Sequence, residues 1–212
     1  MSIIQFIKRG YKWIRNYWKH LGLKNIHKTA KVHYSVLVNN PDNLIMAEQT
    51  SLDGGAIIMN DRAKLIFKRN SGAAVGFTAI TGNHMSVVGK NLKQVDDRVK
   101  DELDINKEMD KDILIEEDVW IGTRVTLLSG AHLGRGCEVG AGSVVRGSTP
   151  PYSVVIGNPC KVVGFRFTPE EIIEHEKVQY EESERLPFDM LQKNYEKYFL
   201  NRIKDIKQFT KL

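Results

Sequence analysis

"IEEDVW IGTRVT LLSGAH LGRGCE VGAGSV VRGSTP", residues 115–150, repeats with a period of six residues. The first residue of every group is aliphatic, and the fifth is small or β-branched. The first positions are Ile115, Ile121, Leu127, Leu133, Val139 and Val145, and the fifth positions begin with Val119, Val125, Ala131, Cys137 and Ser143. A period of six fits neither the 3.6-residue turn of a helix nor a long simple alternation. It therefore predicts a solenoid of short strands joined by tight turns.

Three groups of six would close one triangular coil of about 18 residues. Successive coils would stack at the strand spacing of roughly 4.8 Å, and each would bury its aliphatic side chains on those of the next. The same period continues less regularly upstream, in groups that start at Ile26, Val32, Leu52 and Ile66. We therefore predict one all-β solenoid domain over residues 26–165.

The glycines of LGRGCEVGAG, residues 133–142, have a second interpretation. Their spacing is similar to that of a dinucleotide-binding turn, which should follow one strand and open a helix. These glycines instead stay in phase with the flanking groups of six. We interpret them as tight turns at the corners of the solenoid.

Three further motifs accompany the repeat: DVWIG at 118–122, GAGSVV at 140–145 and PPYSVVIGNPCKVV at 150–163. Together with the repeat, they resemble the hexapeptide-repeat acyltransferases over about residues 26–165. TGNH at 81–84, followed by DVWIG, is similar to the galactoside, maltose and xenobiotic O-acetyltransferase branch. The resemblance implies a left-handed parallel β-helix, a homotrimer and acetyl-CoA as the acetyl donor. The left hand comes from the resemblance alone.

His84 ends a coil just before a long loop, and the other five histidines lie elsewhere in the chain. Acyl transfer to a hydroxyl needs a base that takes the hydroxyl proton, and histidine suits that task near neutral pH. A lone histidine is more often structural, but the resemblance implies that His84 is the catalytic base. Asn83, which lies between the glycine and the histidine, is similar to the xenobiotic branch. We expect Asn83 to bind the substrate.

The resemblance also implies a donor site. Trp120 would line the cleft near the catalytic histidine, and the main chain at Thr123 and Ala141 would meet the pantetheine arm of CoA. The alternative for Trp120 is plain core packing.

Cations would bind the nucleotide end of CoA, where they pair with phosphates. Arg146 and Lys161 match such positions in the resembling proteins. A further arginine of the family falls on Gly164 here, and Arg166, two residues later, could substitute for it. The alternative for these cations is a solvated rim.

Residues 85–112 interrupt the repeat with eight acidic and six basic side chains. Typical connections have about 4 to 6 residues, so this excursion predicts either a functional loop or a disordered surface insertion. The resemblance implies that the loop folds over the acceptor site.

The N-terminal segment is strongly basic, because residues 1–31 hold eight Lys and Arg residues and no acidic residue. Apolar residues recur there at three- and four-residue spacing: Ile4, Ile7, Tyr11, Ile14, Trp18 and Leu21. This pattern predicts an amphipathic helix over residues 1–25. Such a helix either covers one end of the core or makes peripheral contact with anionic lipid. No nucleic-acid-binding signature accompanies the cations, so we expect no nucleic-acid partner.

The sequence of the C-terminal segment, residues 166–212, predicts a helical tail. TPEE at 168–171 is a capping box that starts a helix at Pro169, and a second helix follows Pro187. Leu191, Tyr195, Phe199, Ile203 and Ile206 have the spacing of one helical stripe. The stripe predicts packing over the last coil and protection of its strand edges, with a trimer or acceptor contact as the alternative.

Other function classes fit less well. The two cysteines form no disulfide framework and no CxxC pair, and no stretch approaches the roughly 20 apolar residues of a membrane span. We expect a cytoplasmic protein, with peripheral membrane contact through residues 1–25 as the alternative for that segment. A zinc enzyme on this scaffold would need histidines at metal-ligand spacing, which His33, His84 and His132 lack, so we expect no metal.

We therefore expect an acetyl-CoA-dependent O-acetyltransferase that acts on a hydroxyl of a sugar or polysaccharide precursor. One alternative is an N-acetyltransferase of an amino-sugar or a xenobiotic (antibiotic) acetyltransferase. The other is a CoA-binding or scaffold β-helix without turnover.

Overall fold

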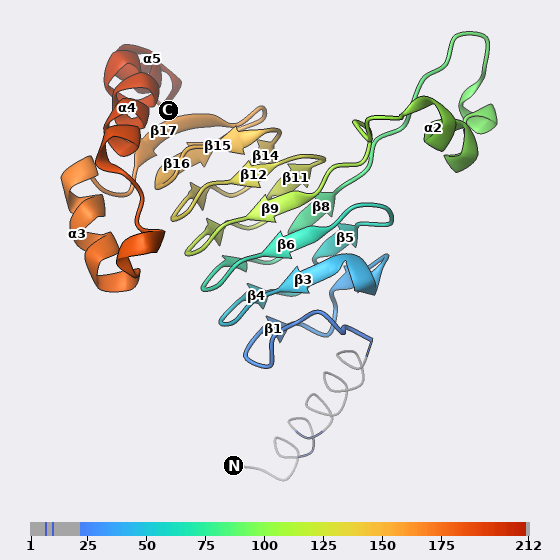
Figure 1. Cartoon of the computed structure of the whole chain (residues 1–212), viewed down its shortest axis with the longest axis horizontal. Coiled ribbons are helices and arrows are strands. Elements are labelled where there is room, and N and C mark those ends of the chain that lie inside the picture. Colours follow the sequence, from blue (N-terminus) through green and yellow to red (C-terminus); the bar gives the residue numbers. More distant parts are fainter. Residues whose placement is uncertain (1–6, 8–9, 11–21, 211–212) are drawn as a thin grey trace.

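The computed structural model describes residues 7, 10 and 22–210, and its repeat region consists of three sheets whose strands are parallel, apart from one antiparallel strand at the edge of sheet 1 (Figure 1). Sheet 1 contains β1 (Lys31–Val32), β4 (Ser51–Leu52), β7 (Gly72–Ala73), β10 (Trp120–Ile121), β13 (Glu138–Val139), β16 (Ser153–Ile156) and β17 (Lys161–Phe165). Sheet 2 contains β2 (Leu37–Val38), β5 (Ile57–Met59), β8 (Thr78–Ile80), β11 (Thr126–Leu128) and β14 (Val144–Val145). Sheet 3 contains β3 (Leu44–Met46), β6 (Leu65–Phe67), β9 (Ile113–Ile115), β12 (His132–Leu133) and β15 (Ser148–Thr149).

The chain visits sheets 1, 2 and 3 in turn, and a short 3-10 helix, Pro41–Asn43, precedes β3. Trp120 pairs with Glu138 and Thr126 with Val144, so each partner lies 18 residues farther along the chain. All six first positions and the five named fifth positions of the repeat are buried. The six-residue period and its inward-facing positions are therefore confirmed.

One upstream group was predicted in the wrong register. Phe67, not Ile66, is the core residue, since Phe67 pairs with both Met46 and Ile115 and is buried. Ile66 lies between Leu65 and Phe67, which both face inward, so alternation along the strand turns Ile66 outward. A slip of one residue exchanges the two faces of a strand, and a group that begins with two apolar residues does not fix that choice.

The glycines of residues 133–142 serve the turns for two physical reasons. Gly136 and Gly142 have φ values of +68° and +71°, a region in which a side chain is strained. Gly134 lacks this conformation, but a Cβ there would lie 2.7 Å from the main chain of Pro151 in the next coil. Their interpretation as solenoid turns is therefore confirmed at these positions.

The C-terminal tail contains α3 (Pro169–Gln179), a 3-10 turn (Glu182–Glu184), α4 (Phe188–Tyr198), a second 3-10 turn (Leu200–Arg202) and α5 (Ile203–Thr210). Both hydrogen bonds of the predicted capping box are present between Thr168 and Glu171. The prediction that Leu191 to Ile206 form one apolar stripe on a single helix is wrong, because the stripe is divided between two helices. Phe199, with φ −123° and ψ −68°, leaves the helical conformation and separates α4 from α5.

The edge of sheet 1 is covered by β17, which pairs antiparallel with β16 and which the repeat did not predict. The tail packs outside that strand and on the last coil. The ring of Tyr195 on α4 lies 5.3 Å from that of Phe165 on β17, and Leu191 packs with buried Tyr152 and Ile172.

The amphipathic helix predicted for residues 1–25, and its lipid contact, rest on residues 1–6, 8–9 and 11–21, which lie outside the described residues. None of the helices in the described part of the chain combines the length and the apolarity needed to span a bilayer.

Candidate active site

The insertion at residues 85–112 is mostly loop and carries two short helical segments. It leaves the coil after β8 and returns at β9, and it contains a 3-10 turn (Leu92–Gln94) and α2 (Asp97–Leu103). Asp96 caps α2 by accepting hydrogen bonds of 3.1 Å from the main-chain N–H groups of Arg98 and Val99. The insertion extends outward from the coils, with α2 on it (Figure 1). It lies at the corner where sheet 2 passes to sheet 3.

A pocket of about 600 Å³ lies where the insertion meets this corner. Met59 and Ile80, from neighbouring strands of sheet 2, give it an apolar part. The polar part includes the side chains of His84, Asp61 and Asp97. The pocket therefore combines an imidazole and carboxylates with apolar surface.

His84 is exposed and lines this pocket together with Asn83. The main chain leading to His84 is tied to the returning arm of the insertion. The N–H of Asn83 donates to Met109 O at 3.0 Å, and the Asn83 side-chain amide donates to the same oxygen at 3.1 Å. Gly82 forms an isolated bridge with Asp110. No hydrogen-bond partner for the His84 ring is found within residues 22–210.

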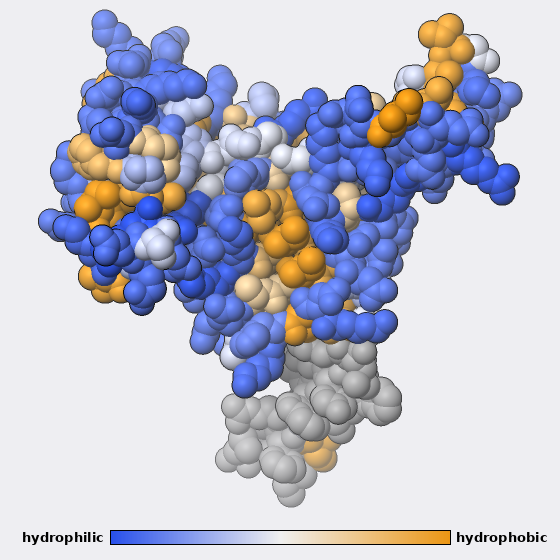
Figure 2. All heavy atoms as spheres, in the orientation of Figure 1, coloured by the Kyte–Doolittle hydropathy of each residue, from blue (hydrophilic) through white to orange (hydrophobic). Residues whose placement is uncertain are grey.

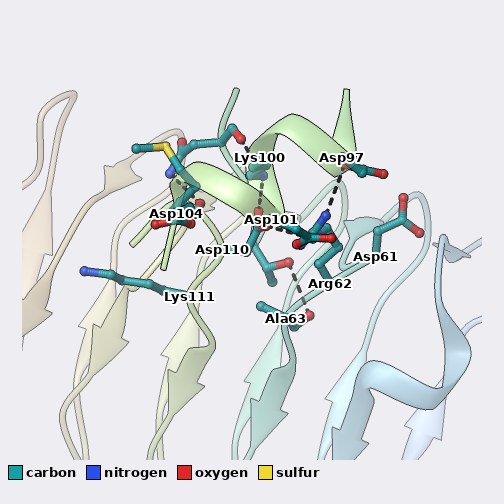
Figure 3. A network of polar contacts seen from close by, with 12 residues as sticks. Asp61, Arg62, Ala63, Asp97, Lys100, Asp101, Asp104, Asp110 and Lys111 are labelled. Carbon is teal, nitrogen blue, oxygen red and sulfur yellow. Dashed lines mark hydrogen bonds and ion pairs between the residues drawn. The ribbon is translucent and has the colours of Figure 1, made fainter. Parts of the chain in front are cut away.

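Five charged side chains, all labelled in Figure 3, connect the insertion to the coil. Arg62, in the turn after β5, lies 3.0 Å from Asp110 and 3.3 Å from Asp97, and it also contacts Asp101. The Lys100 Nζ donates to Asp110 Oδ1 at 2.6 Å. Hydrogen bonding to Asp101 raises the pKa of Arg62 more than burial lowers it. Sequence reasoning missed these residues, because the insertion's eight acidic and six basic side chains allow many pairings.

The residues expected to meet the pantetheine arm of CoA, and Trp120 beside them, lie on sheet 1 and at its turns. Trp120 is 54% exposed, whereas its neighbour Ile121 is buried, so plain core packing of Trp120 is wrong. Thr123 and Ala141 are exposed, and Gly142 N donates to Thr123 O at 2.9 Å, which joins these two turns. No acceptor for the main-chain N–H of Thr123 or Ala141 is found among residues 22–210.

The three cations expected at the nucleotide end of CoA differ in their surroundings. Arg146 and Lys161 are exposed, and Lys161 Nζ lies 4.9 Å from the ring centre of Phe209. Arg166 Nη1 instead donates to Asp118 Oδ2 at 2.7 Å and to Gly136 O at 3.1 Å. A phosphate would have to compete with these partners for Arg166.

A single chain does not bring the two halves of the expected site together. His84 lies at the corner between sheets 2 and 3, and Trp120 faces outward from sheet 1, the remaining side of the coil. Within the described residues, no group of three or more His, Cys, Asp or Glu side chains has a metal-binding arrangement.

The repeat region of this chain is similar in sequence to known proteins. Residues 112–147 match the family model described as bacterial transferase hexapeptide (six repeats). A protein named "Probable acetyltransferase" from Mycobacterium tuberculosis is 49% identical over 51 residues, which cover 24% of this chain and 17% of the relative. A "Probable macrolide acetyltransferase" from Lysinibacillus sphaericus is 44% identical over 61 residues, 29% of this chain and 34% of the relative. The chain thus matches about a sixth to a third of the length of these curated relatives.

Solved structures extend the likeness to about three quarters of the chain. A hexapeptide-repeat-containing acetyltransferase from Vibrio cholerae superposes with a TM-score of 0.55 at 21% identity, over 71% of this chain and 84% of that one. A maltose O-acetyltransferase from Clostridium difficile gives 0.52 at 21% identity, over 76% and 87%. An N-acyltransferase from Bacillus cereus, in complex with dTDP and 3-hydroxybutyryl-CoA, gives 0.55 at 13% identity, over 77% and 94%. The Vibrio protein has also been solved with acetyl-CoA.

These comparisons confirm the resemblance predicted from the motifs. Parallel sheets visited in turn, together with these structural neighbours, fit a left-handed β-helix with a C-terminal helical tail. Residues 112–147 carry the bacterial transferase hexapeptide repeat, and the surrounding fold is the one found in hexapeptide-repeat acetyltransferases.

Proposed function

We propose that this chain is an acetyl-CoA-dependent acetyltransferase that acetylates a hydroxyl group of a sugar or of a polysaccharide precursor. The observation that carries the proposal is the exposed His84 in a pocket of about 600 Å³, on the fold of hexapeptide-repeat acetyltransferases. A pocket of that size suits a small-molecule acceptor. Such pockets are lined by apolar surface together with a few polar groups.

His84 is the general base of this proposal. One ring nitrogen takes the proton of the acceptor hydroxyl while the oxygen attacks the thioester carbonyl carbon. The carbon–sulfur bond then breaks, and the imidazolium returns its proton to the leaving thiolate. The products are the acetyl ester and free CoA.

The donor would lie along the turns of sheet 1. Thr123 and Ala141 are exposed, and their main-chain N–H groups, which have no acceptor among residues 22–210, can donate to the amide carbonyls of a pantetheine arm. Trp120 offers an exposed ring beside them. Cys160 N donates to Val144 O at 3.1 Å, so the segments that carry Lys161 and Arg146 are neighbours. Their cations suit the phosphates of CoA.

A homotrimer would complete the site, because His84 and Trp120 lie on different sides of one solenoid. A ring of three copies joins two different patches of each subunit. Two apolar faces are available. On sheet 2, Leu37, Ile57 and Met59 are 60%, 43% and 51% exposed.

On sheet 3, Ile45, Ile66 and Leu114 pair in one outward row, and Figure 2 shows an apolar patch over β3, β6 and β9. We propose that these apolar faces take part in the trimer contact.

N-acetylation of an amino-sugar is the second candidate, and the carboxylates of the pocket favour it. Asp61 and Asp97 can hold an ammonium group as well as hydroxyls. The similar structures include both a maltose O-acetyltransferase and an N-acyltransferase. Release of CoA thiol should be measured with matched acceptors that differ only by hydroxyl or amine at one carbon. No release with any acceptor of the panel would favour a scaffold instead.

The decisive variant is His84→Ala. Turnover should fall by about 100- to 10,000-fold, the usual contribution of a positioned general base, while CoA affinity and oligomeric state stay unchanged. His132→Ala is the matched control, because His132 lies on sheet 3 and contacts Glu116 instead of the pocket. More than a tenth of wild-type turnover in His84→Ala, with chemistry limiting the rate, would refute the base.

A further inference from the structure

We propose that Lys100, on α2 of the insertion, is a positioning residue for His84. Its ammonium group holds the peptide plane that joins Asn83 to His84. The inference rests on the proposed role of His84 as general base.

The contact at Asn83 is direct. Lys100 Nζ donates to Asn83 O at 2.8 Å. That carbonyl belongs to the same planar peptide unit as the N–H of His84, because the partial double bond keeps the unit rigid. Fixing the oxygen therefore fixes the orientation of the peptide from which the His84 side chain departs.

The insertion holds the preceding peptide as well. Asn83 N donates to Met109 O at 3.0 Å, and Lys111 N donates to Thr81 O at 3.1 Å. Both main-chain polar groups of Asn83 therefore have partners in the insertion. The coil alone does not set the direction in which the chain leaves β8 towards His84.

Lys100 is itself held in place. It is 9% exposed, and its second acceptor, Asp110 Oδ1 at 2.6 Å, balances its charge. The other oxygen of Asp110 lies 3.0 Å from Nε of Arg62 in the turn after β5. A buried ammonium needs such a partner, since an unpaired buried charge is costly. Contacts therefore run from the coil to the peptide before His84: Arg62 contacts Asp110, Asp110 contacts Lys100, and Lys100 contacts the Asn83 carbonyl.

This arrangement matters for the chemistry because a base must reach the hydroxyl proton within hydrogen-bond distance. Misplacement of a reacting group by about 1 Å can cost roughly 100-fold in rate. We expect Lys100→Met, which keeps the chain length and removes the ammonium group, to lower kcat by about 10- to 100-fold. The KM for acetyl-CoA should stay within about twofold, because the proposed donor residues lie outside the insertion.

The test is a double-mutant cycle in the full-length protein. In the His84→Ala background, Lys100→Met should cause no further decrease in kcat, because the imidazole that Lys100 positions is absent. Lys93→Met is the control, since Lys93 is exposed on the same insertion and should keep wild-type kcat. Asp110→Asn keeps an acceptor for Lys100 and should give a smaller loss than Lys100→Met. Limited proteolysis should leave residues 85–112 as resistant in each variant as in the wild type.

The outcomes separate cleanly. Equal losses from Lys100→Met in both backgrounds, or no loss in either, would overturn the inference while leaving His84 as the base. Increased cleavage in residues 85–112 of both Lys100→Met and Asp110→Asn would also overturn it, since Lys100 would then only hold the insertion. Full turnover of His84→Ala would overturn the proposed function first, and the positioning role with it.

Discussion

Replacement of Glu176 should detach the helical tail from the last coil. Glu176 lies on α3 and is completely buried. One of its oxygens accepts from Tyr152 Oη at 2.9 Å and the other from Leu186 N at 2.7 Å, and both lie 3.2 Å from Arg135 Nη1. Burial, and next the charge of Glu176, raises the pKa of Tyr152 far above its usual range, so the phenol remains a donor.

The expected magnitude follows from the partners that Glu176→Leu would leave behind. The buried Tyr152 hydroxyl and the Leu186 N–H would each lose an acceptor, at about 1–3 kcal/mol for a group without a partner. Arg135 would keep Glu117, whose Oε2 lies 3.3 Å from its Nε, so its charge would stay paired. The two groups without an acceptor together predict a loss of about 2–6 kcal/mol in the free energy of unfolding.

Urea denaturation of Glu176→Leu, followed by circular dichroism and by the fluorescence of the tail tyrosines, measures this loss. Glu174→Leu is the matched control, because Glu174 is exposed on the same helix and should change the free energy of unfolding by less than about 0.5 kcal/mol. A loss below about 1 kcal/mol in Glu176→Leu would refute the reasoning, since the leucine would then replace the network without cost.

Two further predictions concern acid stability and assembly. Burial would raise the pKa of Glu116, but the hydrogen bonds and charges of Lys68 and His132 together outweigh burial and lower it. The carboxylate of Glu116 therefore stabilises the fold at pH values above the ordinary glutamate pKa of about 4.3. This stabilisation is lost as the pH falls through the lower pKa of the folded state. In Glu116→Gln, the free energy of unfolding should therefore decline less steeply between about pH 5 and pH 3. For assembly, light scattering of the wild type should give three times 24.2 kDa. Ile57→Lys should shift the mass towards the monomer and abolish turnover, whereas an active monomer would contradict the shared site.

The repeat was predictable because its physics is local. Each group of six places one aliphatic and one small residue inward, and every neighbouring coil has the same pattern. The burial of the first positions from Ile115 to Val145 could therefore be predicted from their spacing alone. The capping box at Thr168 was predictable for the same reason, since both of its partners lie within four residues. The motif TGNH singled out His84 through its resemblance to known acetyltransferases.

The tertiary structure decided what depends on contacts between distant residues. Ile66 and Phe67 are both apolar, and only pairing with the neighbouring coils selects Phe67 for the core. The antiparallel β17 has no repeat signal, because it forms only where β16 offers a free edge.

The surroundings of His84 depend on tertiary structure in the same way. Lys100 and Asp110 are two of fourteen charged residues in the insertion, and their pairing with each other and with Arg62 follows from how the insertion folds back on the coil. The sequence by itself determined the solenoid, its inward-facing residues and the candidate base. Only the tertiary structure decided which buried charges hold the peptide before that base, because ion pairs between segments far apart in the chain leave no periodic pattern.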